Sequence, residues 1–171
     1  MDSYDLKALG LLATRARSSW AELARTMGLS APAAAERVRQ LEKRGVIRGY
    51  EARMAPEQLG HLLTAFIAVT LPRNRDRPAF LHAVARTPEI LECHHVTGDD
   101  DYLLKVRCRD TADLERVISS ALKARLSVRT RSTIVLSTAK ETAVLPQFSA
   151  RHTAGPQTGA ATAALKRNRG R

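Results

Sequence analysis

The spacing of apolar residues predicts two neighbouring helices near the start of the chain. The first carries four apolar residues on one stripe: Trp20, Leu23, Ala24 and Met27. Gly28 follows this stripe directly, where a helix end needs a residue that tolerates positive φ. Ser30 then stands at an N-cap position, and Pro32 lies in the first turn of the next helix. These signals predict a tight turn between two helices.

The second helix separates apolar from polar residues and ends at Gly45. Its apolar face consists of Ala34, Val38 and Leu41. Its opposite face is polar and partly basic, and consists of Ala33, Glu36, Arg37, Gln40, Lys43 and Arg44. A helix-turn-helix with such a face fits the major groove of DNA. Any antiparallel helix pair with a solvated charged face gives a similar pattern, but the agreement of turn, cap, stop and charge favours DNA binding.

The segments on either side complete a winged-type helix-turn-helix domain over residues 1–53. Residues 2–17 predict a first helix with an apolar stripe formed by Leu6, Leu9, Leu12 and Ala13. Residues 46–53 alternate between apolar and polar side chains, and this alternation predicts a strand that follows the three helices.

After a hinge at residues 54–60, β-rich segments alternate with helical ones. Seven segments are expected: strand 61–71, helix 77–86, strand 90–97, turn 98–101, strand 102–108, helix 110–123 and strand 127–140. This βαββαβ order predicts an α+β, ferredoxin-like domain over residues 61–145, with both helices on one face of an antiparallel sheet. Four residues of the first helix are expected to face the sheet: Phe80, Leu81, Val84 and Ala85. We expect a second copy of the chain to cover the other face.

The formal net charge of +11 lies mostly at the two ends of the chain. Residues 1–53 carry 10 basic and 6 acidic side chains, residues 54–145 carry 13 and 11, and residues 146–171 carry 5 and 0. This asymmetry suits an end that binds a polyanion and a nearly neutral module that assembles or senses. Residues 146–171 have few apolar side chains to bury, and this composition predicts a basic, disordered tail. Such a tail either contacts phosphates or only solubilises the protein.

The chain has no features of a membrane or secreted protein. No apolar run reaches the roughly 18 residues that a membrane-spanning helix needs, and the first residues have no signal-peptide pattern. Cys93 and Cys108 lie in no CxxC motif or disulfide framework. We therefore expect a cytoplasmic protein with reduced thiols.

Two sets of motifs extend over about residues 2–145. The first set is Asp2-x-x-Asp5, Ala21-Glu22-Leu23-Ala24, Gly28-Leu29-Ser30, Glu36-Arg37-Val38-Arg39-x-Leu41-Glu42 and Gly45-Val46-Ile47-x-Gly49-Tyr50. The second set is Leu91-Glu92-Cys93-His94-x-Val96-Thr97-Gly98-Asp99-x-Asp101-Tyr102-Leu103-Leu104. With these motifs the chain resembles the Lrp/AsnC family of bacterial and archaeal regulators. The resemblance implies binding to double-stranded DNA, homodimers that often assemble into octamers, and a small amino-acid effector held near the Gly-Asp-x-Asp turn.

The chain departs from the family pattern in three places. In the family, the second helix of the ferredoxin-like domain is usually followed by Leu-Pro-Gly-Val, whereas here the chain reads Leu126-Ser127-Val128, one residue shorter and without Pro or Gly, and we expect a different local geometry beside the effector pocket. Arg129 and Arg131 make the last strand unusually basic. The basic tail extends past the usual end of the family.

The residues expected at DNA fall into two groups. Phosphate contacts are expected from backbone N–H groups at the start of the recognition helix and from Ser30, Arg37, Lys43, Arg44 and Arg48. Base edges are expected to meet Ala31, Pro32, Ala33, Glu36 and Gln40. Arg37 has an alternative interpretation, because it can instead pair with Glu36 or with an acid of the first helix.

The run Asp99-Asp100-Asp101 permits three interpretations. Its oxygens suit Mg²⁺ or Ca²⁺; a carboxylate can hold the α-ammonium of an amino acid while N–H groups near Gly98 hold its carboxylate; or the run is a solvated turn. The family resemblance favours an effector site, with the expected residues Thr97, Gly98, Asp99, Asp101, Tyr102 and Thr133.

Other chemistry fits the sequence less well. Cys93, His94 and His95 suggest zinc, but adjacent strand residues point to opposite faces, so we expect no metal and no cofactor besides the effector. Sirohaem decarboxylases resemble this family in fold, and His94, His95, Arg129 and Arg131 would serve such an enzyme. An architectural protein that coats DNA without preference is a second alternative. The intact basic face favours a non-enzymatic, sequence-preferring transcriptional regulator modulated by a small amino acid.

Overall fold

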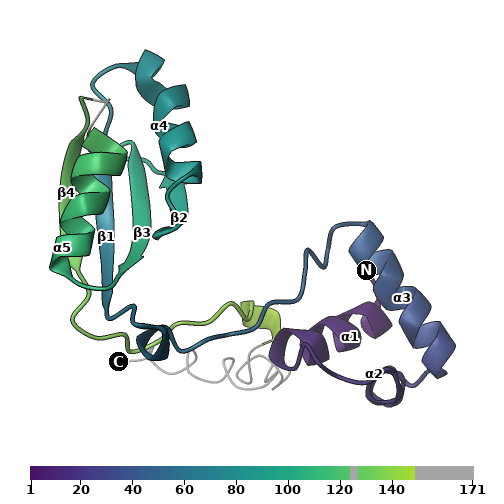
Figure 1. Ribbon diagram of the computed structural model, residues 1–171. Coiled ribbons are helices and arrows are strands. Elements are labelled where there is room, and N and C mark those ends of the chain that lie inside the picture. Colours follow the sequence, from purple (N-terminus) through teal and green to yellow (C-terminus); the bar gives the residue numbers. More distant parts are fainter. Residues whose placement is uncertain (124–126, 149–171) are drawn as a thin grey trace, which may run out of the picture. The chain divides into compact units, whose positions relative to one another are not determined.

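The chain folds into two compact units, shown in Figure 1. The computed structural model describes residues 1–123 and 127–148. One unit consists of Met1–Ala52 together with the segment that begins at Glu141, and the other consists of Arg53–Lys140. The second unit is therefore inserted, in sequence, into the first.

The described part of the first unit contains three α-helices: α1, Ser3–Thr14; α2, Trp20–Met27; and α3, Ala31–Lys43. The hydroxyl of Ser30 caps α3 by accepting a hydrogen bond from the backbone N–H of Ala33 at 3.4 Å. Gly28 ends α2 in the left-handed region with φ 75°. Residues that carry a side chain adopt this backbone conformation only with strain. The predicted helix-turn-helix is confirmed.

The core of this unit consists of Ala8, Leu23, Ala24, Met27, Ala34 and Val38. Half of these residues are alanines. The predicted apolar stripe of α1 is only partly right: Leu12 packs against the core, but Leu6 is 42% exposed and Ala13 is exposed, whereas Asp5 and Ala8 are buried. Trp20 is also exposed rather than buried. A polar residue occupies the inner face of α1 because Arg37 of α3 supplies Asp5 with a cationic partner.

The predicted strand at residues 46–53 is not formed, and the first strand among the described residues begins at Leu63. A strand needs the backbone of a neighbour to complete its hydrogen bonds, and alternation of side chains does not supply one. Tyr50 in this segment donates a hydrogen bond to Glu42 of α3 at 2.8 Å. Burial, aided by Glu42, raises the pKa of Tyr50 to about 12.

The second unit has the predicted βαββαβ order. Its antiparallel sheet has the strand order β2-β3-β1-β4, formed by β1, Leu63–Thr70; β2, Ile90–His95; β3, Tyr102–Cys108; and β4, Arg129–Ile134. Its helices are α4, Arg77–Ala85, and α5, Thr111–Arg116, which continues as the π-helical segment Val117–Lys123. Short 3-10 helices are η1, Pro56–Leu59, and η2, Asn74–Asp76. Both α4 and α5 cover the same face of the sheet (Figure 1).

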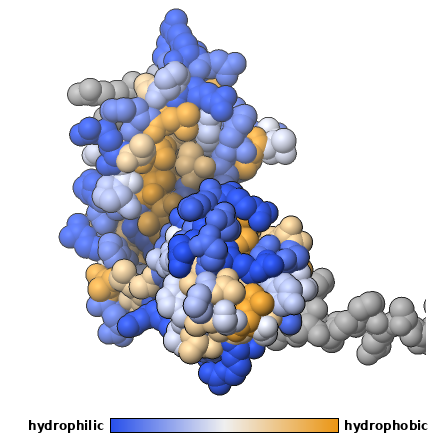
Figure 2. Space-filling view, turned by 90° about the vertical axis from the view of Figure 1, so that its right-hand side faces the viewer, coloured by the Kyte–Doolittle hydropathy of each residue, from blue (hydrophilic) through white to orange (hydrophobic). Residues whose placement is uncertain are grey.

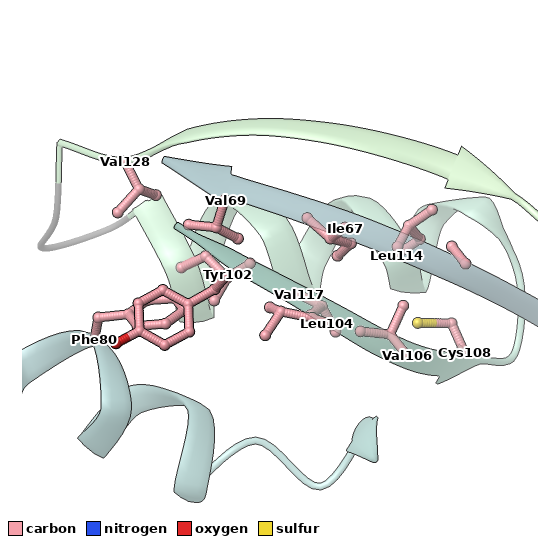
Figure 3. Close-up of a cluster of buried hydrophobic side chains, with 12 residues drawn as sticks. Ile67, Val69, Phe80, Tyr102, Leu104, Val106, Cys108, Leu114, Val117 and Val128 are labelled. Carbon is pink, nitrogen blue, oxygen red and sulfur yellow. The ribbon is translucent and has the colours of Figure 1, made fainter. Parts of the chain in front are cut away.

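The core lies between that face and the two helices, as Figure 3 shows. The sheet contributes alternate residues of its central strands, namely Ala65, Ile67, Val69, Tyr102, Leu104, Val106 and Cys108. Phe80 of α4 packs against Tyr102 with ring centroids 4.8 Å apart. Two expectations are wrong here: Leu81 and Ala85 are exposed, and β4 ends at Ile134 rather than at residue 140.

The opposite face of the sheet carries an apolar centre with charged surroundings. Strand register places Phe66 of β1 between Lys105 and Thr133, and Ala68 between Leu103 and Arg131. Phe66 is 37% exposed. Figure 2 shows hydrophobic side chains gathered among hydrophilic ones on the surface of the second unit.

The C-terminal segment returns to the first unit. Pro146–Phe148, which the sequence assigns to a disordered tail, form the 3-10 helix η4. Phe148 Cδ1 lies 3.4 Å from the position that a Cβ atom on Gly10 of α1 would take. Leu126 of the shortened segment and the tail from residue 149 onward lie outside the described residues.

Candidate functional site

The exposed face of α3 carries a hydrogen-bonded network centred on Glu36. Its carboxylate accepts hydrogen bonds from Gln40 Nε2 at 2.7 Å and from Arg39 Nη1 at 2.5 Å. The bond from Gln40, followed by the charges of Arg39 and Lys43, holds the pKa of Glu36 below its usual value against the opposing effect of burial. Glu36 therefore holds a cation and an amide side by side. The sequence prediction omits Arg39, although its spacing of three residues from Glu36 is a signal for such a pair.

The other predicted DNA contacts at the ends of α3 are all exposed: Ser30, Ala31, Pro32, Ala33, Lys43, Arg44 and Arg48. The backbone donors at the start of the helix are fewer than expected. Pro32 has no N–H group, and the N–H of Ala33 donates to the hydroxyl of Ser30. The N–H of Ala31 and the hydroxyl hydrogen of Ser30 are therefore the donors that this helix start offers to an anion.

Arg37 points away from this face, toward α1. Its Nη1 donates hydrogen bonds to Asp2 Oδ2 at 2.7 Å and to Asp5 Oδ1 at 3.0 Å. The hydrogen bonds to Asp2 and Asp5 raise the pKa of Arg37. The alternative interpretation, pairing with acids of the first helix, is what the structure shows.

In the turn after β2, two of the three carboxylates accept hydrogen bonds from neighbouring segments of the sheet. Asp101 Oδ2 accepts a hydrogen bond from the backbone N–H of Leu71 at 2.6 Å. Asp100 accepts from the hydroxyl of Thr70 at 3.2 Å and from Arg131 Nη2 at 2.7 Å. Asp99 is exposed, as are Thr97 and Gly98. Among the three, Asp99 is therefore the carboxylate best placed to meet a ligand.

Two predicted effector residues lie on opposite faces of the sheet. Tyr102 faces the helices, is 3% exposed, and its hydroxyl has no hydrogen-bond partner among the described residues. Its ring lies beside His95, with centroids 5.1 Å apart, and beneath the guanidinium of Arg77. Thr133 of β4 pairs with Phe66 of β1, so it lies on the open face. Phe66 is four residues before Thr70, the end of β1 that contacts the turn through Asp100. Within one chain, Thr133 and Tyr102 do not share a pocket.

The histidines and cysteines are dispersed. His94 contacts Glu92 at 3.1 Å on the open face, whereas His95 lies on the helix face with Tyr102. Burial raises the pKa of Cys108 to about 11, so this thiol is a poor nucleophile near neutral pH. In residues 1–123 and 127–148, no three His, Cys, Asp or Glu side chains are grouped to hold a metal, and no helix is long and apolar enough to cross a membrane.

Two family models match the chain. The AsnC-type helix-turn-helix domain matches residues 1–42, and the Lrp/AsnC ligand binding domain matches residues 64–145. The first match includes α1, α2 and nearly all of α3, and the second includes all of the sheet except Leu63, the first residue of β1.

Named relatives are similar over most of the chain. The HTH-type transcriptional regulator LrpA of Mycobacterium tuberculosis is 40% identical over 141 residues, which cover 81% of this chain and 91% of the relative. The leucine-responsive regulatory protein of Escherichia coli is 38% identical over 146 residues, with 82% and 88% covered. A transcriptional regulator from Neisseria meningitidis, solved in complex with L-methionine, matches with TM-score 0.81 and 32% identity over 86% of this chain and 97% of that one.

Both parts of the structure thus match the same family, and the two named relatives match 81% and 82% of this chain rather than one domain. The chain belongs to the Lrp/AsnC family.

Proposed function

We propose that this protein is a sequence-preferring, DNA-binding transcriptional regulator whose assembly or DNA affinity is modulated by a small amino acid. The observation that carries the proposal is the exposed face of α3, which is capped, supported by a core, and holds Glu36, Arg39 and Gln40 in one network. The family models and the named regulators among the relatives support the same function.

The proposed contacts divide between charge and base edges. Lys43, Arg44 and Arg48 supply charge toward phosphates. Gln40 and Arg39 face the base edges and are oriented by Glu36, while Ala31, Pro32 and Ala33 make apolar contacts such as those to a thymine methyl. Arg37 is not among the proposed phosphate contacts, because its guanidinium pairs with Asp2 and Asp5.

The DNA proposal is tested by selecting sequences from a random pool with the wild-type chain and measuring affinities by fluorescence anisotropy. Gln40→Ala is expected to weaken binding to the selected sequence about tenfold, within the roughly 1–3 kcal/mol of a specific base contact. The matched control Gln58→Ala, exposed on η1, is expected to leave it unchanged. A protein that enriches no sequence, and binds all DNA with the same steep salt dependence, would be the architectural alternative.

The effector is proposed to bind at the end of the sheet marked by residues 97–102. Asp99 is exposed there to meet an α-ammonium group, and the buried hydroxyl of Tyr102 lacks a hydrogen-bond partner in the described part of the chain. Thermal-shift measurements with each of the twenty amino acids test this, since a ligand of the native state raises its stability. Asp99→Asn is expected to abolish the shift, and the surface control Glu115→Gln to preserve it. If no amino acid shifts the transition, this part of the proposal fails.

Self-association is proposed through the open face of the sheet, because Phe66, Ala68 and Leu103 form its apolar centre. Analytical ultracentrifugation is expected to show a dimer or a larger assembly, such as an octamer. Phe66→Glu is expected to shift the population to monomers, whereas Leu136→Glu, at a residue 96% exposed, is expected to have no effect. Equal behaviour of the two variants would rule out this face as the interface.

A further inference from the structure

One guanidinium group of α3 closes a network at the N-terminus of α1. Asp2 and Asp5 form a reciprocal capping box: Asp5 N–H donates to Asp2 Oδ1 at 2.9 Å, and Asp2 N–H donates to Asp5 Oδ2 at 3.3 Å. The remaining oxygen of each carboxylate accepts a hydrogen bond from Arg37 Nη1. All four carboxylate oxygens are therefore used, and the same two residues cap α1 and bind α3.

The surroundings of Arg37 favour a role inside the protein. Its guanidinium lies 5.1 Å from the ring centroid of Tyr4, within the range of a cation–π contact. Asp5 is buried, with a side chain 9% exposed. On an α-helix, Arg37 is turned about 100° from Glu36, the centre of the exposed network. Two carboxylates also offset its single charge, which weakens its attraction to a phosphate.

We propose that Asp2, Asp5 and Arg37 form a clamp that fixes the tilt of α3 against α1, and that they are positioning residues for the DNA-reading side chains. This inference rests on the proposed DNA-binding function. Among the buried residues of the shared core, α1 contributes Ala8 and α3 contributes Ala34 and Val38, and the two alanines interlock less than large side chains do. The clamp supplies a directional contact that these alanines do not.

The geometry makes the tilt of α3 important. A helix of 13 residues is about 20 Å long at about 1.5 Å per residue, so a tilt of about 10° moves its far end by roughly 3 Å. Hydrogen bonds to base edges tolerate far smaller displacements. Loss of the clamp should therefore reduce sequence preference much more than it reduces general attraction to DNA.

The test compares Asp2→Asn, Arg37→Gln and the double variant in the full chain. Asn caps a helix as well as Asp does, so Asp2→Asn keeps the cap and removes one of the two ionic partners of Arg37, leaving Asp5. Affinities are measured for the selected DNA and for poly(dI-dC), over a range of salt concentrations. Glu51→Gln, which removes an exposed acid elsewhere in the same unit, is the matched control for the change in charge.

The clamp predicts that Asp2→Asn weakens binding to the selected DNA about threefold and Arg37→Gln about tenfold, with poly(dI-dC) binding and the salt slope unchanged. It also predicts that the double variant is no weaker than Arg37→Gln, because both changes break one contact. A direct phosphate contact by Arg37 predicts the opposite: both DNAs lose affinity equally, the salt slope falls by about one, and Asp2→Asn binds more tightly. That result would overturn the clamp but leave the proposed function intact, whereas a wild-type chain that selects no sequence would overturn the function itself.

Discussion

Replacing Leu23 by alanine should unfold the DNA-binding unit while the other unit stays folded. Leu23 is 1% exposed and belongs to a core in which three of six buried members are alanines. No member of that core belongs to residues 53–140. The damage should therefore remain within the first unit.

The magnitude follows from burial and from the size of the unit. Leucine-to-alanine changes at fully buried sites cost about 3–5 kcal/mol, because apolar burial is lost and a cavity remains. A core as small as this one supplies only about 3–5 kcal/mol of net stability. Leu23→Ala is therefore expected to remove most or all of the stability of the unit at 25 °C.

Urea unfolding followed by two probes provides the assay. Trp20 is the chain's one tryptophan and lies in α2, so its fluorescence reports the first unit alone. Far-UV circular dichroism reports both units. The control is Leu6→Ala, at a residue of α1 that the sequence places in the core and the structure shows to be 42% exposed. It should cost less than about 1 kcal/mol.

In Leu23→Ala, the fluorescence transition should move to low urea, while a second transition in circular dichroism keeps its wild-type midpoint. Equal losses for Leu23→Ala and Leu6→Ala would refute the assignment of the core. Coincident transitions of both probes in Leu23→Ala would refute the independence of the units.

Three further changes have expected signs. Gly28→Ala should destabilise the first unit by about 1–2 kcal/mol in thermal unfolding, because φ is +75° although a Cβ meets nothing within 4 Å. Gly10→Ala should stabilise it by up to about 1 kcal/mol, because helix propensity rises and Phe148 stays in ordinary contact. Hydrogen bonds from two arginines hold the pKa of Asp113 well below its usual value; its stabilisation, present above about pH 4, should be lost on acidification, and Asp113→Asn should remove that acid sensitivity in circular dichroism.

Local chemistry made the helix-turn-helix predictable. Ser30 and Gly28 act on backbone groups within a few residues of themselves, so sequence alone defines the cap and the turn. The inner face of α1 was not predictable in this way. Asp5 is buried because of Arg37, a partner 32 positions away, and a search for apolar stripes assigns no inner position to an aspartate.

The remaining differences between the sequence predictions and the structure depend on strand pairing and on hydrogen bonds between distant residues. The alternation at residues 46–53 resembles a strand but meets no partner among the described residues. The family resemblance suggested that Thr133 and Tyr102 belong to one effector site, yet strand register places them on opposite faces of the sheet. Asp100 and Asp101 were indistinguishable from Asp99 in sequence, and only their hydrogen bonds to Thr70, Arg131 and Leu71 separate them.

Photo-crosslinking from α3 tests the central claim most directly. A photoreactive benzoylphenylalanine placed at Gln40, on the exposed face of α3, is compared with one placed at Ala13, exposed on α1 of the same unit. The account predicts that position 40 crosslinks to bases of the selected duplex and that position 13 does not. Equal crosslinking from both positions, or crosslinking from position 13 alone, would contradict the claim that this face of α3 reads DNA.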